Sequence, residues 1–181
     1  MSSPILTTRR LGHREYSILS TVLQRWSIQA ERGLSETENV TLRQRLSDCQ
    51  VMCGEIASIL RSAESCAELN IIVCEDARSR PQAILSAWKK ERCYSILKVA
   101  TCPWNIFPTA EENDLGFPVK GAGTKVARAL IEKAQTELLS VELSALGSAK
   151  VFWETLGFEE DDTRASTPNS IPMILSLSRR S

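Results

Sequence analysis

A short glycine-containing loop lies directly before a strongly periodic segment, and this junction constrains the fold most. Gly121-Ala122-Gly123-Thr124 leads into residues 124–138, whose apolar positions recur at three-four spacing and predict an amphipathic helix. Glycines at a helix start let backbone amides approach an anion closely, and the helix dipole favours negative charge there. The loop therefore predicts a pyrophosphate-type anion site with Lys120 and Lys125 adding charge, unless the glycines only form a tight turn.

Two common nucleotide-binding motifs do not fit this loop. A dinucleotide-binding loop requires a third glycine and a βαβ unit, whereas this loop has two glycines and follows a predicted strand meander. A P-loop ends in Gly-Lys-Ser/Thr, whereas Lys125 is followed by Val126. The neighbouring segments must therefore indicate what this loop binds.

Hydrophobic periodicity predicts the other elements. The patterns predict further helices over residues 15–32, 40 to about 67 and 148–156, and strands over residues 5–11, 69–74, 82–88, 94–101, 139–145 and 173–177. Gly33 is a predicted helix stop, Ser35 and Glu38 form a predicted capping box, and Gly54 marks a candidate break in the second helix. Pro103 ends the strand before the long connection over residues 104–120. This order of elements predicts helices packed on one mixed sheet.

A second segment lies one predicted strand after the glycine loop. Residues 148–158 read Ser-Ala-Lys-Val-Phe-Trp-Glu-Thr-Leu-Gly-Phe. They resemble the Ala-x-x-Phe-Tyr-x-x-x-Gly-Phe segment of the GNAT N-acyltransferases, and the glycine loop with its helix resembles the acyl-CoA-binding motif of that family. The resemblance covers residues 94–158 and extends to the last predicted strand, while the N-terminal helices fit in outline. Read without a ligand, the segment is an amphipathic helix with Phe152 and Trp153 in the core and Gly157 as its C-cap.

The resemblance implies one GNAT-like domain over residues 1–181. Its fold class is α/β (α+β), with a central mixed, mostly antiparallel sheet flanked by helices and a splayed strand pair that forms the acyl-CoA cleft. It also implies acetyl-CoA as co-substrate and direct attack of an amine on the thioester, with backbone groups near residues 99–101 polarising the carbonyl oxygen. The resemblance assigns these residues to acyl-CoA binding: Val99, Ala100, Thr101, Gly121, Ala122, Gly123, Thr124, Lys125, Ala149 and Phe152.

Three positions depart from the family pattern. Pro118 stands where the family often has Arg or Gln, and Leu146 stands where an Asn is common. Trp153 stands where the family has the Tyr that protonates the departing thiolate. An indole N–H donates hydrogen bonds but is not a usable acid. We therefore expect another group or water to supply this proton, or transfer to be slow or absent.

Several carboxylates are candidates for the general base that takes the proton of the attacking amine. Glu142 lies on the predicted strand between the two motifs, and Glu111, Glu112 and Asp114 lie in the long connection, where they also suit a cationic amine. For each of the four taken singly, a solvated surface carboxylate is the preferred interpretation.

Two other residues near the strand end have alternative interpretations. Cys102 is not expected to be a nucleophile because the only histidine, His13, lies far away in sequence. Trp104 either stacks on a ligand at the cleft mouth or closes the core.

Charge and cysteine usage exclude several classes. Lys plus Arg and Asp plus Glu both number 22. This balance of charge gives no indication of a nucleic-acid or membrane partner, both of which usually bind a basic face. The six cysteines form no CxxC pair and predict reduced, mostly buried thiols and no metal site. We expect a cytoplasmic protein, with organelle targeting or export as an effector left open. Residues 1–14 faintly resemble a transit peptide, but an opening strand is the preferred interpretation.

The sequence thus predicts an N-acetyltransferase that moves an acetyl group from acetyl-CoA to an amine of a small molecule or a protein. The alternative is a catalytically weak or silent acyl-CoA-binding or interaction module with the same fold. A homodimer is left open.

Overall fold

The computed structural model describes residues 5–62, 67–106, 119–167 and 170–176. Its elements in chain order are β1 (Thr7–Arg10), the 3-10 turn η1 (His13–Glu15), α1 (Tyr16–Glu36), α2 (Val40–Ser62), β2 (Leu69–Glu75), β3 (Pro81–Lys89), β4 (Cys93–Thr101), η2 (Pro103–Asn105), α3 (Ala122–Thr136), β5 (Ser140–Ala145), η3 (Gly147–Ala149), α4 (Lys150–Glu154), β6 (Glu159–Glu160) and β7 (Ile171–Leu175).

One seven-stranded sheet organises the molecule, in the order β1-β2-β3-β4-β5-β7-β6. Each neighbouring pair is antiparallel except β4 and β5, which run parallel. The predicted meander through β2, β3 and β4 is confirmed, and the fold class is the mixed, mostly antiparallel sheet flanked by helices that the sequence predicted.

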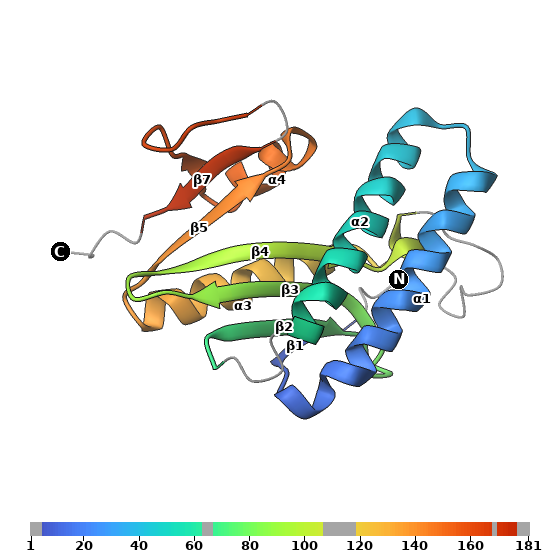
Figure 1. The fold of residues 1–181 in the computed structure, drawn as a ribbon, viewed down its shortest axis with the longest axis horizontal. Helices are drawn as coiled ribbons and strands as arrows, with labels where there is room; N and C mark the ends of the chain where they lie inside the picture. Colours follow the sequence, from blue (N-terminus) through green and yellow to red (C-terminus); the bar gives the residue numbers. More distant parts are fainter. Residues whose placement is uncertain (1–4, 63–66, 107–118, 168–169, 177–181) are drawn as a thin grey trace.

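Helices cover both faces of the sheet (Figure 1). The helices α1 and α2 pack together on one face, over a core that includes Leu23, Trp26 and Ile56. The helix α3 packs on the other face, over a core that includes Leu130 and Met173. The described helices include none that is long and apolar enough to cross a membrane.

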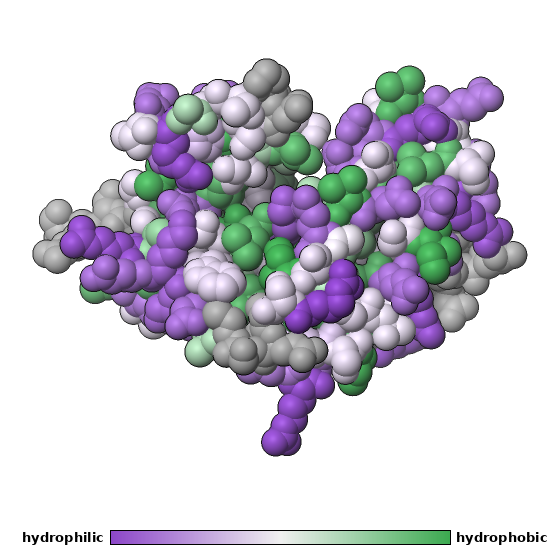
Figure 2. Space-filling view, viewed as in Figure 1, coloured by the Kyte–Doolittle hydropathy of each residue, from purple (hydrophilic) through white to green (hydrophobic). Residues whose placement is uncertain are grey.

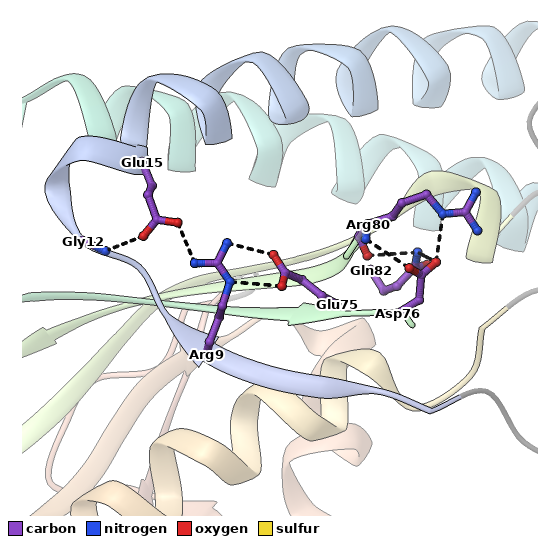
Figure 3. A network of polar contacts seen from close by, with 7 residues as sticks. All are labelled: Arg9, Gly12, Glu15, Glu75, Asp76, Arg80 and Gln82. Atoms are coloured by element: carbon purple, nitrogen blue, oxygen red, sulfur yellow. Dashed lines mark hydrogen bonds and ion pairs between the residues drawn. The ribbon is translucent and has the colours of Figure 1, made fainter. Parts of the chain in front are cut away.

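Two groups of polar contacts, one on β1 and one at the turn between β2 and β3, fix these parts of the fold (Figure 3). Arg9 on β1 donates two 3.0 Å hydrogen bonds to the carboxylate of Glu75 on β2, and a third to Glu15 at the start of α1. Asp76 accepts hydrogen bonds from Arg80 and Gln82 across the next turn. The contacts of Arg9 tie β1 to the sheet edge, so the predicted opening strand is confirmed over the shorter range Thr7–Arg10.

The helix α1 runs past its predicted end. Gly33 is buried inside α1, which continues to Glu36. The last carbonyls of the helix are satisfied from α2, because the Arg43 guanidinium donates hydrogen bonds to the carbonyl oxygens of Leu34 and Thr37. The helix therefore does not need a glycine at its end, and the predicted stop is wrong.

The predicted capping box is also wrong. The hydroxyl of Ser35 donates to the Arg32 carbonyl inside α1 instead of opening α2. The cap of α2 is Asn39, whose side-chain oxygen accepts the amide of Leu42 at 3.1 Å.

Several other boundaries differ from the predictions. The helix α2 is continuous through Gly54 and is described as far as Ser62; residues 63–66 of the predicted helix lie outside the described residues. The last predicted helix is a 3-10 turn followed by the five-residue α4, and Gly157 ends this segment with φ 90°. The last strand begins at Ile171 and contains Pro172, and the two-residue β6 was not predicted.

Candidate functional site

The strand β4 separates from β5 halfway along its length. Their parallel register joins Cys93–Ile96 only to residues 140–143, although β4 continues to Thr101. The register with β3 shifts at the same place, because Ala87 pairs with Ile96 and Ser86 pairs with Lys98. Leu97 is therefore the extra residue of a β-bulge, and such a bulge bends its strand. The splayed strand pair expected from the sequence is present, and the bulge supplies its physical cause.

The bulge also reverses which residues of β4 face which helices. Before it, Tyr94 and Ile96 face the core beneath α3; after it, Val99 packs against that core, while Ala100 lies in the core beneath α1 and α2. Thr101 lies on the α3 side, where its methyl group approaches Gly123. The three predicted residues of β4 thus line the opening from both faces.

The two glycines before α3 have separate structural roles. Gly121 is the N-cap of α3 and has φ 83°, a left-handed conformation that side chains other than that of glycine rarely adopt. A Cβ on Gly123 would lie 3.3 Å from the Thr101 methyl group, so this glycine keeps the helix start against the end of β4. The loop and the splayed strand therefore meet at one place.

Some backbone amides at the start of α3 are available to a ligand, whereas others already donate hydrogen bonds within the chain. The amide of Lys125 donates to the Gly121 carbonyl at 3.0 Å, and its ammonium donates to the Leu6 carbonyl at 2.9 Å. The amides of residues 121–124 precede the first intrahelical bond, and a helix offers them no acceptor. An anion bound at this helix start would therefore contact these four amides, whereas both donor groups of Lys125 are engaged within the chain.

A chain of hydrogen bonds through the side chains of Asn105 and Gln82 supports the residues before this loop. The amide of Val119, two residues before Gly121, donates to the side-chain oxygen of Asn105 at 2.7 Å. Asn105 donates to the side-chain oxygen of Gln82 at 3.1 Å, and the fully buried Gln82 donates to Asp76 at 3.1 Å. The network shown in Figure 3 thus continues from the turn between β2 and β3 to the residues before the glycine loop.

The segment around α4 forms the opposite wall of the opening. Ala149, Phe152 and Trp153 line it, and Trp153 is only 6% exposed. The indole contacts Phe152 and Phe158 edge-on, with ring centroids 4.8 Å and 5.3 Å away. Trp153 therefore packs as a core residue and borders the opening at the same time.

Between these walls lies a cavity of about 380 Å³. Its lining comes from α2, from β4 from Ile96 onward, from Gly123 of α3, from the end of β5 and from the segment that leads into α4. Figure 2 shows the molecule hollowed between the part that holds α4 and β7 and the part that holds α1 and α2, with hydrophobic residues along the hollow. A volume of this kind admits a small acyl group and its acceptor.

Glu142 does not line this cavity. It lies on the part of β5 that still pairs with β4, opposite Ser95. Its carboxylate forms ion pairs with Lys90 and, at 3.7 Å, with Arg164. Burial opposes the charged form, but hydrogen bonds from Lys90 and Ser95 outweigh burial and lower the pKa of Glu142. The structure therefore provides no geometric support for Glu142 as a base, because its carboxylate is committed to cations outside the cavity.

The other candidates from the sequence lie elsewhere. Glu111, Glu112 and Asp114 fall outside the described residues. Cys102 is fully buried beneath α1 and α2, and Trp104 packs edge-on against Trp26 at 6.3 Å, so Trp104 closes the core.

The thiols of α2 do not provide a nucleophile. Cys49 and Cys53 lie on one buried face of the helix, as predicted. The Cys49 thiol lies 3.2 Å from the Thr101 carbonyl oxygen as a hydrogen-bond donor, and its pKa is raised by its hydrogen bond with Cys53 and by burial. Within the described ranges, no group of three His, Cys, Asp or Glu residues is placed to hold a metal ion.

Sequence reasoning missed the charged residues of α2 that border the cavity. Arg45 and Asp48 line it together with Ser148 from the opposite wall. The hydroxyl of Ser148 donates to Asp48 at 3.4 Å across the opening. No local signal distinguishes these two residues from other charged positions of an amphipathic helix, because only the fold brings α2 to the end of β4.

Known structures share this arrangement of elements. The PaiA N-acetyltransferase of Thermoplasma acidophilum, solved with coenzyme A, is similar over 98% of this chain and 100% of its own, with TM-score 0.58 and 10% identity. The ribosomal-protein-S18-alanine N-acetyltransferase of Escherichia coli is similar over 97% of both chains, with TM-score 0.56 and 13% identity. A predicted acetyltransferase of Clostridium acetobutylicum, solved with acetyl-CoA, covers 90% of this chain and 96% of its own, with TM-score 0.52 and 14% identity.

Sequence comparison finds no matching family model and no matching curated protein. The structural likeness nevertheless defines the fold class. The chain has the fold of the GNAT-type N-acyltransferases, as the two sequence motifs predicted.

Proposed function

We propose that this protein is an N-acyltransferase that moves an acetyl group from acetyl-CoA to an amine. The observation that carries the proposal is the meeting of the bulged, splayed end of β4 with the start of α3, where four amides precede the first intrahelical bond. This arrangement offers an extended backbone edge next to an anion cradle, and the two together suit the pantetheine arm and pyrophosphate of an acyl-CoA.

The residues present fit such a ligand. The amides of residues 121–124 would hold the pyrophosphate, and Gly123 keeps the cradle open where a side chain would crowd Thr101. Beyond Ile96, the edge of β4 that faces the cavity has no pairing strand in the described part of the chain, so its backbone groups are free to bond the arm. Ala149, Phe152 and Trp153 would form the apolar wall.

The co-substrate supplies an acetyl thioester. The amine nitrogen forms a bond to the carbonyl carbon, the carbon–sulfur bond breaks, and the products are an amide, a thiol and one released proton. The backbone near residues 99–101 would donate a hydrogen bond to the carbonyl oxygen as its negative charge develops. Trp153 would stabilise the leaving group only by packing or by a hydrogen bond, since an indole carries no usable acid.

Two observations support a second candidate function. Trp153 lacks the acidity of the family's tyrosine, and Glu142 is engaged in ion pairs outside the cavity. A protein that binds acyl-CoA without turnover would show the same cradle. The two functions differ in thiol release with an amine panel, and both require acyl-CoA binding.

Calorimetric titration with acetyl-CoA tests the shared requirement. We expect one-to-one binding by the natural chain and loss of binding in Gly123→Glu, because that change places a carboxylate in the anion cradle. Gly54→Glu is the matched control, since a Cβ on Gly54 meets nothing within 4 Å and the residue lies on α2 away from this cavity. The milder Gly123→Ala serves if the glutamate variant fails to fold. Unchanged affinity in a folded Gly123→Glu variant would contradict the assignment of the cradle.

Thiol release from acetyl-CoA then separates the two functions. Release that depends on an added amine supports the transferase, whereas binding without release supports the silent module.

A further inference from the structure

The cavity carries two charges on neighbouring turns of α2 that the transfer of an acetyl group does not itself require. Arg45 and Asp48 are three residues apart on that helix, and both line the cavity. Side chains at this spacing share a helix face, with about 5–6 Å between their Cβ atoms. The question is what these two charges bind.

The carboxylate of Asp48 lies close to the proposed reaction centre. Its neighbour Cys49 contacts the Thr101 carbonyl at the end of β4, which places this turn of α2 over the splayed strand. On the other side, Ser148 donates to Asp48 at 3.4 Å from the segment that carries Ala149. Asp48 thus bridges the two walls between which the thioester would lie.

The charge of Asp48 is not balanced by a cation of the described chain. Its two hydrogen-bond partners are the neutral side chains of Gln44, at 2.8 Å, and Ser148. Asp48 is half-buried and faces the cavity, so its unpaired negative charge favours a cationic ligand there. A protonated amine, the resting form of the acceptor, has the complementary charge.

Arg45 differs from the other cation of the lining. Lys98 is paired with Glu55 at 2.5 Å, so its charge is already compensated. Arg45 forms no ion pair with any residue that the structure describes, and none joins it to Asp48. A guanidinium in this position suits a carboxylate or another oxyanion of the same ligand.

We propose that the acceptor is a zwitterionic amine, whose ammonium group binds Asp48 and whose anionic group binds Arg45. The class includes free amino acids and peptides with an acidic residue at the N-terminus. This inference rests on the proposed acetyl transfer and adds to it the chemical class of the acceptor. Asp48 acts by binding the amine next to the thioester, and Arg45 selects among amines.

Acceptor kinetics with acetyl-CoA test the assignment. The panel consists of amino acids and acidic dipeptides, each beside its analogue with carboxamides in place of carboxylates, with spermidine as a purely cationic comparison. We expect the natural chain to prefer the carboxylate form in kcat/KM by at least about tenfold, as a charge-assisted hydrogen bond implies. In Arg45→Gln this preference should vanish, and in Asp48→Asn the KM of both forms should rise at least about tenfold while the KM of acetyl-CoA stays unchanged.

A matched control variant distinguishes a specific loss of acceptor binding from a general loss of stability or activity. Glu31→Gln removes an exposed carboxylate of α1 that does not line the cavity, and it should leave both constants unchanged. An unchanged amine KM in Asp48→Asn, or a preference of the natural chain for spermidine, would overturn the assignment while leaving acetyl transfer intact. Absence of turnover by the natural chain with every acceptor would overturn the proposed function, and the acceptor class with it.

Discussion

At the scale of single residues, the two glycines of the loop show how one motif meets two different demands. Gly121 is required for its backbone, because φ 83° costs a residue with a Cβ about 1 kcal/mol or more. Gly123 is required for space, because Thr101 lies where its Cβ would be. A substitution at Gly121 therefore acts on the helix start, whereas one at Gly123 acts on the contact between the loop and β4.

Trp153 is the residue whose replacement tests the departure from the family pattern. We expect Trp153→Tyr to keep or raise the rate of acetyl transfer, since a phenol donates a proton that an indole cannot. Trp153→Phe is the control, because it makes a similar change in volume without adding an acid. The measurement is thiol release under saturating acetyl-CoA, with folding checked by circular dichroism. A large loss of rate in a folded tyrosine variant would mean that the indole itself takes part in the reaction.

Sequence reasoning found those site residues whose signal is local. The glycine pair precedes a predicted helix, and Phe152 and Trp153 belong to the segment that resembles the GNAT pattern, so a short stretch of sequence was enough to indicate each pair. Asp48 lies 73 positions before Gly121, and nothing around it differs from an ordinary exposed helix face. Gln82 reads as a polar residue of a strand, and only the fold shows that it is buried beneath the loop.

At the scale of elements, the sequence predicted most strands and helices but not the irregularities that make the site. The bulge at Leu97 has no sequence signal, because an apolar residue inside an apolar strand fits a regular ladder equally well. The helix stop predicted at Gly33 and the break predicted at Gly54 are absent, because packing between α1 and α2 overrides the modest cost of glycine inside a helix. Tertiary contacts, which the local pattern does not contain, decided these positions.

Asn105 connects β3 to the residues before the glycine loop, and its replacement tests whether this connection supports acetyl-CoA binding. Asn105→Ala removes the acceptor of the Val119 amide and the donor to Gln82, so the residues before Gly121 lose their support. We expect the dissociation constant of acetyl-CoA to rise by about tenfold, the effect of one or two lost hydrogen bonds, measured by calorimetry.

Asn39→Ala is the matched control for this change. It removes the cap of α2 and should lower the free energy of unfolding by about 1 kcal/mol with no change in acetyl-CoA affinity. An equal loss of affinity in both variants would mean that Asn105 acts through overall stability alone.

At the scale of the whole molecule, one ionic cluster joins α3 to the hairpin between β3 and β4. The carboxylate of Glu137, just after α3, contacts Lys133 at 2.6 Å, Lys89 at 2.7 Å and the Tyr94 hydroxyl at 2.9 Å. Hydrogen bonds from Lys133, Lys89 and Tyr94 lower the pKa of Glu137 to about 2. Because the folded pKa lies below the unfolded value, this cluster stabilises the fold at neutral pH and loses its effect as the pH falls.

The corresponding prediction concerns stability against pH. Glu137→Gln should lower the free energy of unfolding at pH 7 by about 1 kcal/mol, since the group is partly solvated. The difference from the natural chain should shrink as the pH falls from about 4.5 towards 2. Urea titrations at several pH values measure it, with the exposed Glu159→Gln as the control that should show no difference. A difference that stays constant down to pH 2 would contradict the ionic origin.

The short parallel contact between β4 and β5 has a mechanical consequence. In the described part of the chain, pairing between the two halves of the sheet is limited to Cys93–Ile96 and residues 140–143, so the halves are joined at one end and separate towards the other. In such a geometry a small rotation at the joined end produces its largest displacement at the free ends, where Asp48 and Ser148 face each other. We expect the paired end to stay fixed, and the distance between the free ends to adjust to acceptors of different bulk.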